Sequence, residues 1–194
     1  MQRKLTSNRA EPKVQSLAEF FTHWSEPLFQ YGCTLTPDRG QVEDAIQDLF
    51  VDLWRRQVEV ASLKAPRTYL LTALRRLLLR NLQRAERSVD PWISEHAWQA
   101  LVAEEPVATF AEQEERALAC REAIASLPRR QREVINLRYY QGLSYREIAA
   151  VMGIKTSSVG RFLDRAITSL RTYLPQRLQQ TLVNSMLLIG WLGG

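Results

Sequence analysis

Residues 127–171 carry helix-boundary signals that leave few folds open to this part of the chain. Ser144 and Glu147 have the spacing of a capping box, in which the serine oxygen accepts a first-turn N–H and the glutamate bonds back to the cap. Gly153 follows the short apolar helix that this box begins, at a position where glycine adopts positive φ without steric cost. Thr156 and Ser157 can both cap a longer helix, so the segment predicts a helix-turn-helix.

The second helix of this pair has a polar and basic outer face. In DNA-binding helix-turn-helix proteins, the first turns of this helix enter the major groove. The residues that we expect to contact DNA are Arg146, Lys155, Ser157, Ser158, Arg161 and Arg165. Arg161 could bind guanine or phosphate, whereas Lys155 and Arg165 are better suited to phosphate. The alternative is a helical hairpin inside another kind of all-α protein, which the coincidence of capping box, turn glycine and basic face disfavours.

Charge is distributed in blocks along the chain. Lys and Arg outnumber Asp and Glu in residues 1–90 and again in 128–194, whereas acidic residues dominate 91–127. Two basic blocks around an acidic connector suggest two modules that face nucleic acid. Few glycines and prolines and rare β-branched runs favour an all-α fold. We therefore expect two small helical domains joined by an acidic linker, with the helix-turn-helix in the C-terminal one.

A helix predicted over residues 41–57 carries an acidic stripe. Asp44, Asp48 and Asp52 recur every four residues. Like charges at this spacing destabilise an isolated helix by a few tenths of a kcal/mol per pair, and a basic partner surface would reverse the sign of that effect. The alternative is a solvated acidic face, and the spacing alone does not decide between the two.

A basic stripe follows on the helix predicted over residues 66–87. Arg76, Arg80 and Arg84 recur every four residues with Arg75 beside them, and no acidic residue lies in the stretch from 66 to 85. Duplex or melted DNA is the natural counter-charge for such a stripe. The alternative is a solvated arginine face.

Two separate stretches of the sequence resemble one known family, the extracytoplasmic-function (ECF) group of bacterial RNA polymerase sigma factors. The C-terminal similarity runs through Leu127-Pro128, Gln131-Arg132-Glu133-Val134, Leu137-Arg138-Tyr139, Gly142-Leu143-Ser144, Glu147-Ile148-Ala149, Gly153, Val159, Arg161, Leu163, Arg165-Ala166 and Leu170-Arg171. The N-terminal similarity runs through Glu43, Asp44, Gln47, Asp48, Phe50, Leu53 and Trp54. LuxR-type regulators share much of the C-terminal pattern, so the choice between families depends on the N-terminal half.

The resemblance implies a role for each predicted helix. In the family, the acidic helix docks on the clamp helices of the largest polymerase subunit, and the corresponding residues here are Asp44, Gln47, Asp48, Phe50 and Asp52. The basic helix and the loop before it bind the −10 element, which implicates Arg67, Tyr69, Arg75, Arg76, Arg80 and Arg84. Tyr69 could stack on an unpaired base, an interaction worth ~1–3 kcal/mol, or it could be a core residue. The helix-turn-helix would contact the −35 element.

Three residues depart from the common family pattern. Arg76 and Arg80 stand where the family frequently has Asn and Asp, which raises the basic character of this helix. Gly160 stands where the family often has Lys, and a glycine inside a helix costs about 1 kcal/mol relative to alanine. The glycine would also let the backbone approach DNA closely.

The expected organisation has five parts. They are a disordered N-terminus (1–13), an N-terminal sigma domain (14–87), a linker (88–111), a C-terminal helix-turn-helix domain (112–174) and an apolar extension (175–194). The apolar run at residues 186–192 is far shorter than the roughly 20 residues that a membrane span needs. The extension could fold back on the C-terminal domain or bind a regulator.

The sequence contains no pattern that is typical of a metal site, a cofactor site or a catalytic centre. Cys33 and Cys120 are isolated, and neither they nor the histidines have metal-ligand spacing, so we expect reduced thiols in a cytoplasmic protein without metal or cofactor. No nucleophile or carboxylate pair indicates an enzyme. The expected partners are core RNA polymerase, promoter DNA and, as an open possibility, an anti-sigma factor. The alternative function is a LuxR-type or other helix-turn-helix regulator that acts without replacing a sigma factor.

Overall fold

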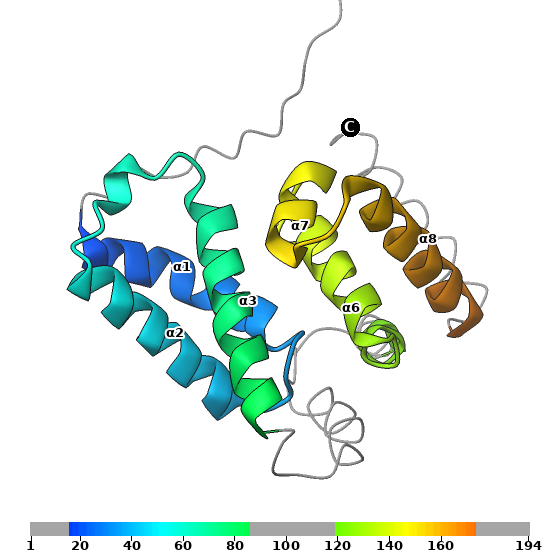
Figure 1. The fold of residues 1–194 in the computed structure, drawn as a ribbon. Coiled ribbons are helices and arrows are strands. Elements are labelled where there is room, and N and C mark those ends of the chain that lie inside the picture. Colours follow the sequence, from blue (N-terminus) through cyan, green and yellow to red (C-terminus); the bar gives the residue numbers. More distant parts are fainter. Residues whose placement is uncertain (1–15, 86–118, 174–194) are drawn as a thin grey trace, which may run out of the picture.

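The computed structural model describes residues 16–85 and 119–173, and its regular elements are helices (Figure 1). The N-terminal unit contains α1 (Leu17–Gly32), α2 (Arg39–Arg55), the short 3-10 helix η1 (Val60–Ser62) and α3 (Pro66–Ala85). The C-terminal unit contains a helical segment at 119–125, α6 (Arg129–Ile135), the π-helical turn η2 (Asn136–Tyr140), α7 (Tyr145–Met152) and α8 (Thr156–Tyr173). The prediction of an all-α fold with a C-terminal helix-turn-helix is confirmed.

Several predicted features lie outside the described residues. They are the N-terminus (1–13), the linker (88–111), the apolar extension (175–194) and the first residues (112–118) of the expected C-terminal domain. The boundaries of the predicted domains therefore stay predictions.

Side-chain caps fix where the first two helices begin. Ser16 Oγ accepts a hydrogen bond from Glu19 N at 3.2 Å, and Asp38 Oδ1 accepts one from Gln41 N at 3.0 Å. Each cap satisfies an N–H that the helix itself leaves unpaired. Pro27 lies inside α1, and the helix continues past it to Gly32.

The N-terminal core lies where α1, α2 and α3 meet. Its buried residues include Trp24, Leu28, Tyr31, Leu49, Leu53, Leu70, Leu74 and Leu78. Gly32 permits the closest approach of α1 and α2, because a Cβ added there would lie only 2.4 Å from Val42 Cγ1. Figure 1 shows the three helices packed together, and α2 and α3 each keep exposed residues along their length.

The C-terminal core forms between α6, α7 and α8. Its buried residues include Leu127, Val134, Leu137, Ile148, Val159, Leu163 and Leu170. The helix that begins at Arg129 changes from α to π geometry after Ile135, and Gln141 N donates to Asn136 O five residues earlier. α7 packs against both α8 and α3, so the helix-turn-helix lies directly beside the N-terminal unit (Figure 1).

Candidate nucleic-acid and polymerase interfaces

The acidic stripe of α2 lies on the outside of the molecule. Asp44, Gln47 and Asp48 are exposed, and Asp52 is half-buried. The Asp52 carboxylate accepts a 2.9 Å bond from Nε of Arg56, one turn further on. The structure therefore brings the three predicted aspartates to one surface, and their mutual repulsion favours a basic partner.

Phe50 does not share that surface. Its side chain is only 6% exposed, and its ring packs edge-on against Phe20 and Phe21 at centroid distances of 6.2 and 4.9 Å. Phe50 therefore packs between α1 and α2 in this structure, and a polymerase contact at this residue stays a prediction. The exposed apolar side chains of this face are Val51 and Trp54, the latter 69% exposed. Their spacing of four and seven residues from Gln47 could have identified them.

The arginines of α3 point in two directions, some toward solvent and one toward α6. Arg76, Arg80 and Arg84 are exposed, and none of them forms a salt bridge within the described ranges 16–85 and 119–173. Arg75, one residue before the stripe, is rotated about 100° around the helix. Its Nε donates a 2.6 Å hydrogen bond to Oε1 of Glu133 on α6. The basic stripe is therefore open, but Arg75 is not part of it.

Arg67, at the start of α3, also binds other parts of the protein. Its Nη1 donates to the backbone oxygen of Gln141 at 2.7 Å, and its guanidinium lies 5.4 Å from the ring centroid of Trp24. Arg67 and Arg75 were both expected to face the −10 element, and the structure instead turns both toward acceptors of the C-terminal unit. Helical periodicity cannot reveal such acceptors because they are distant in the sequence. Tyr69 is partly exposed, at 39%, on the same helix.

Glu133 is the centre of a buried polar cluster between the two units. Its side chain is completely buried, and its Oε1 accepts hydrogen bonds from Tyr31 Oη at 2.9 Å and from Arg75. Burial raises the pKa of the Tyr31 hydroxyl well above its usual value, and the charge of Glu133 raises it further. Burial lowers the pKa of Arg75, but its bond to Glu133 outweighs this effect, so the pKa is raised. The sequence gives Glu133 no role beyond its place in the family pattern.

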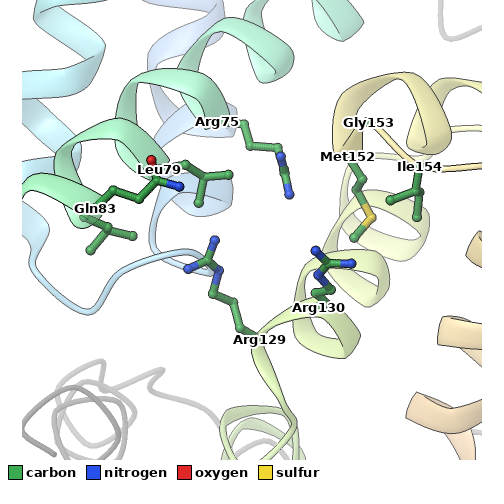
Figure 2. Close-up of a pocket in the computed structure, with 9 residues that line it drawn as sticks. Arg75, Leu79, Gln83, Arg129, Arg130, Met152, Gly153 and Ile154 are labelled. Carbon is green, nitrogen blue, oxygen red and sulfur yellow. The ribbon is translucent and has the colours of Figure 1, made fainter. Parts of the chain in front are cut away.

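A basic cleft of about 510 Å³ opens beside this cluster. Figure 2 shows Arg75, Arg129 and Arg130 at this cleft, the first from α3 and the others from the start of α6. The turn of the helix-turn-helix, residues 152–154, forms another wall. No carboxylate is among the described residues that line the cleft. Guanidinium groups attract anions, but Arg75 is already paired with Glu133, so the unpaired positive charge at this cleft comes from Arg129 and Arg130.

The helix-turn-helix has the local geometry that the sequence predicts. Ser144 Oγ accepts from Glu147 N at 3.4 Å, and Glu147 Oε2 accepts from Ser144 N at 2.8 Å, which completes the capping box. Gly153 ends α7 with a φ of 64°. This left-handed conformation is open to glycine and strained for most other residues, so the turn into α8 depends on it.

The outer face of α8 is open to solvent. Among the six predicted −35 contacts, Arg146, Lys155, Ser157, Arg161 and Arg165 are exposed, and Ser158 is half-buried. Arg161 Nη2 donates to Ser158 Oγ at 3.1 Å, which holds the guanidinium over the first turns of the helix. This placement matches the region of a recognition helix that meets base edges.

Two arginines of the C-terminal unit, Arg132 and Arg138, are buried, which the sequence does not predict. Arg132 donates to the backbone oxygens of Ala125 at 2.7 Å and Leu127 at 3.2 Å. Arg138 donates to the oxygen of Leu143 at 3.0 Å, and its guanidinium lies over the ring of Tyr145. Both therefore bind backbone oxygens at the ends of helices and in loops, and no local sequence signal separates them from the exposed arginines.

Three further features bear on other kinds of function. The two cysteines, Cys33 and Cys120, are free and half-buried. Within residues 16–85 and 119–173, no cluster of potential ligands could hold a metal ion. In the same ranges, no helix combines the length and apolar character required to cross a membrane.

Comparison with known proteins assigns both halves of the chain. Residues 20–88 match the family described as Sigma-70 region 2, and residues 117–170 match Sigma-70, region 4. The chain is 32% identical over 171 residues to the probable RNA polymerase sigma factor RfaY of Xanthomonas campestris pv. campestris, covering 84% of this chain and 41% of that protein. It is 25% identical over 160 residues to the ECF RNA polymerase sigma factor SigK of Mycobacterium tuberculosis, covering 82% and 86%.

A solved structure supports the same fold. The sigma factor RpoE of Bartonella quintana, in complex with the anti-sigma factor NepR, aligns with a TM-score of 0.61 at 21% identity, covering 82% of this chain and 97% of that one. The predicted resemblance is confirmed, and a LuxR-type regulator is not favoured because the N-terminal half matches sigma region 2. The chain belongs to the ECF group of bacterial RNA polymerase sigma factors.

Proposed function

We propose that the protein binds core RNA polymerase and directs promoter-specific initiation of transcription. The observation that carries this proposal is the presence in one chain of an open acidic face on α2, an open basic stripe on α3 and a helix-turn-helix with an open polar face. The first surface suits a basic protein partner, and the other two suit DNA. A protein with all three can connect an enzyme to a promoter.

Each surface has a specific part in this proposal. Asp44, Gln47, Asp48 and Asp52 dock on polymerase, with Val51 and Trp54 as additional apolar contacts on the same face. The stripe of Arg76, Arg80 and Arg84, with Tyr69, meets the −10 region. The start of α8, with Arg146 and Lys155 beside it, meets the −35 region.

The remaining expectations complete the proposal. The boundaries of the sigma domains are 14–87 and 112–174, with 88–111 as the connecting linker. The protein works in the cytoplasm, without cofactor and without catalysis of its own. Because the similar structure of RpoE contains an anti-sigma factor, an anti-sigma factor is a further proposed partner here.

Run-off transcription tests the proposed function. The reaction contains purified bacterial core polymerase, the full chain and a library of upstream fragments from the genome of origin. A parallel reaction uses the triple variant Asp44→Lys, Asp48→Lys and Asp52→Lys. We expect promoter-specific transcripts that require the protein and disappear with the triple variant, because the docking face changes sign.

A matched control separates docking from the total change in charge. Glu26, Glu59 and Glu122 are exposed acidic residues away from this face, and their replacement by Lys adds the same charge. We expect this control to keep promoter-specific transcription. If neither the wild type nor the control binds core polymerase or yields transcripts, while duplex DNA is still bound, the sigma function is contradicted in favour of a stand-alone regulator.

A further inference from the structure

A cavity of about 470 Å³ lies on the other side of α6 from the functions assigned so far. Its lining comes from the second half of α1, the loop after it, the start of α2, the helical segment at 119–125 and the junction of α6 with η2. It shares no lining residue with the basic cleft beside Glu133. Sites for small organic molecules usually have volumes of roughly 300–1,000 Å³. The cavity therefore has the size of a ligand site, and its lining decides which ligand it suits.

Apolar side chains form much of this lining. Phe29 of α1 and Ile124 of the 119–125 segment are half-buried, and Ile135 of α6 is only 1% exposed. Removal of apolar ligand surface from water is the main source of affinity in sites of this kind. A ligand of this cavity therefore needs an apolar body.

Asn136 adds a buried acceptor to the same cavity. Its side chain is only 7% exposed, and its Oδ1 has no hydrogen-bond partner among the residues that the structure describes. A buried acceptor without a donor costs free energy, and nearly all such groups in native proteins are paired with protein, water or a ligand. An N–H or O–H group on the ligand would supply the missing donor.

Positive charge predominates around the cavity. Arg39, at the start of α2, is exposed and forms no salt bridge within residues 16–85 and 119–173. Its guanidinium lies 4.9 Å from the ring centroid of Phe29, so a cation is fixed beside the apolar lining. Arg121 and Arg132 also line the cavity, and Glu26 is the one carboxylate among its described lining residues. This balance of charge attracts an anionic group.

We propose that this cavity is a binding site for a small organic carboxylate. The apolar body of the ligand packs against Phe29 and Ile124, an N–H or O–H group donates to Asn136 Oδ1, and the carboxylate meets Arg39. None of the residues predicted to contact DNA or polymerase lines the cavity. The site is therefore a function separate from the proposed one. A ligand that binds only the folded protein stabilises it, so stability would follow the concentration of the ligand.

Three related test compounds separate the features of this ligand. Indoleacetate has an aromatic body, a ring N–H and a carboxylate. Naphthaleneacetate keeps the carboxylate and a similar body but lacks the N–H, and indoleacetamide keeps the N–H but lacks the charge. Equilibrium dialysis of the full chain measures the affinity for each compound. We expect indoleacetate to bind with a Kd of about 1 mM or below, as suits a ligand of its size. We expect indoleacetamide to bind about fivefold more weakly.

Single substitutions test the two polar contacts. Asn136→Leu removes the acceptor at similar volume, so the ratio of affinities for indoleacetate and naphthaleneacetate should fall about tenfold. Asn81→Leu, at a half-buried position of α3 outside the cavity, should leave this ratio unchanged. Arg39→Gln should weaken indoleacetate about fivefold. Arg55→Gln, at an exposed position at the other end of α2, should have no effect.

Circular dichroism confirms that each variant folds. No binding of indoleacetate to the wild type would overturn the proposal. An unchanged ratio in folded Asn136→Leu, or an unchanged affinity in folded Arg39→Gln, would also overturn it.

Chemical modification of the native cysteines locates the bound compound. Cys33 lines the cavity and Cys120 does not, although both are half-buried. We expect saturating indoleacetate to slow the alkylation of Cys33 and to leave the rate at Cys120 unchanged, as measured by mass spectrometry. Gln30→Trp, at an exposed lining position, should abolish both binding and protection because the larger side chain fills the cavity.

This second measurement decides the proposal even if Asn136→Leu does not fold. Protection of neither thiol or of both, or full binding by folded Gln30→Trp, would place the compound elsewhere and overturn the proposal. Transcription is not part of these measurements. Failure of the proposed function would be seen separately, as absent transcripts with wild-type protein and core polymerase.

Discussion

α3 and α8 are both basic helices that the sequence assigns to DNA, but their surroundings in the structure differ. The basic outer face of α8 is open at Arg161 and Arg165. α3 keeps its stripe open from Arg76 to Arg84, yet it has Arg67 and Arg75 bonded to the C-terminal unit. Periodicity therefore identifies the face of a helix on which a charge lies, but the charge is available only if no other part of the chain covers it.

The largest difference between the two helices should appear in binding to the −35 duplex. We expect Arg161→Ala to weaken binding of the free protein by about 1–3 kcal/mol, the range of a good arginine contact to a base. Arg75→Ala should leave this affinity unchanged, because Arg75 lies on α3 and bonds to Glu133. Fluorescence anisotropy at fixed salt, with a promoter fragment identified by transcription, measures both. Equal losses would remove the distinction between an open and a covered helix.

A second contrast concerns helix stability, because α8 has a glycine in its interior. Gly160→Ala should raise the free energy of unfolding by about 1 kcal/mol, since alanine has the higher helix propensity. The added Cβ would meet only the Tyr145 ring, at 3.9 Å, which is ordinary contact. Urea denaturation measures the change. A loss of stability would show that the Tyr145 ring does not accommodate the methyl group, and weaker DNA binding by the stabilised variant would indicate close backbone approach to DNA.

The helices themselves follow from local sequence signals. The helix predicted at 41–57 corresponds to α2 within two residues at each end, and the helix predicted from residue 66 begins at Pro66 as α3, because apolar spacing and caps act over one or two turns. The capping box at Ser144 and the turn at Gly153 were predictable for the same reason.

The cluster around Glu133 was not predictable from such signals. Tyr31 and Glu133 are separated by 102 positions in the chain, and their bond depends on how the two units pack. Glu133 also has the sequence context of an exposed helical glutamate, surrounded by Arg129, Arg130 and Arg132. The burial of Glu133, and the bond that it accepts from Arg75, depend on tertiary packing, which overrides the preference of a glutamate for the helix surface.

Burial of the Tyr31 hydroxyl beside Glu133, which also binds Arg75 of α3, gives the packing around α3 a dependence on pH that α8 should lack. The folded-state pKa of Tyr31 lies above its value in the unfolded chain, which is about 10. A raised folded pKa means that the stabilisation is fully present below about pH 10 and declines as the pH rises toward the folded value. Between pH 9 and 10.5, wild type should lose more stability than Tyr31→Phe, by less than the about 1.4 kcal/mol that one proton contributes per pH unit.

Urea denaturation at the two pH values provides this comparison. Tyr173→Phe is the matched control, because Tyr173 ends α8 with an exposed side chain. We expect this variant to lose as much stability as wild type. If Tyr31→Phe also matched wild type, the Tyr31 hydroxyl would be neither buried nor bonded to Glu133 in solution.

The smallest expected effect concerns the open part of α3. Each arginine that neutralises a phosphate of single-stranded DNA contributes about 0.7 to the slope of log affinity against log salt. Arg80→Ala should therefore reduce this slope by about 0.7, which changes affinity only two- to threefold between about 50 and 200 mM salt. Arg56→Ala on α2, which pairs with Asp52, should leave the slope unchanged. An unchanged slope for Arg80→Ala would mean that exposure alone does not make an arginine of α3 a DNA contact, and the contrast with α8 would then extend to the whole helix.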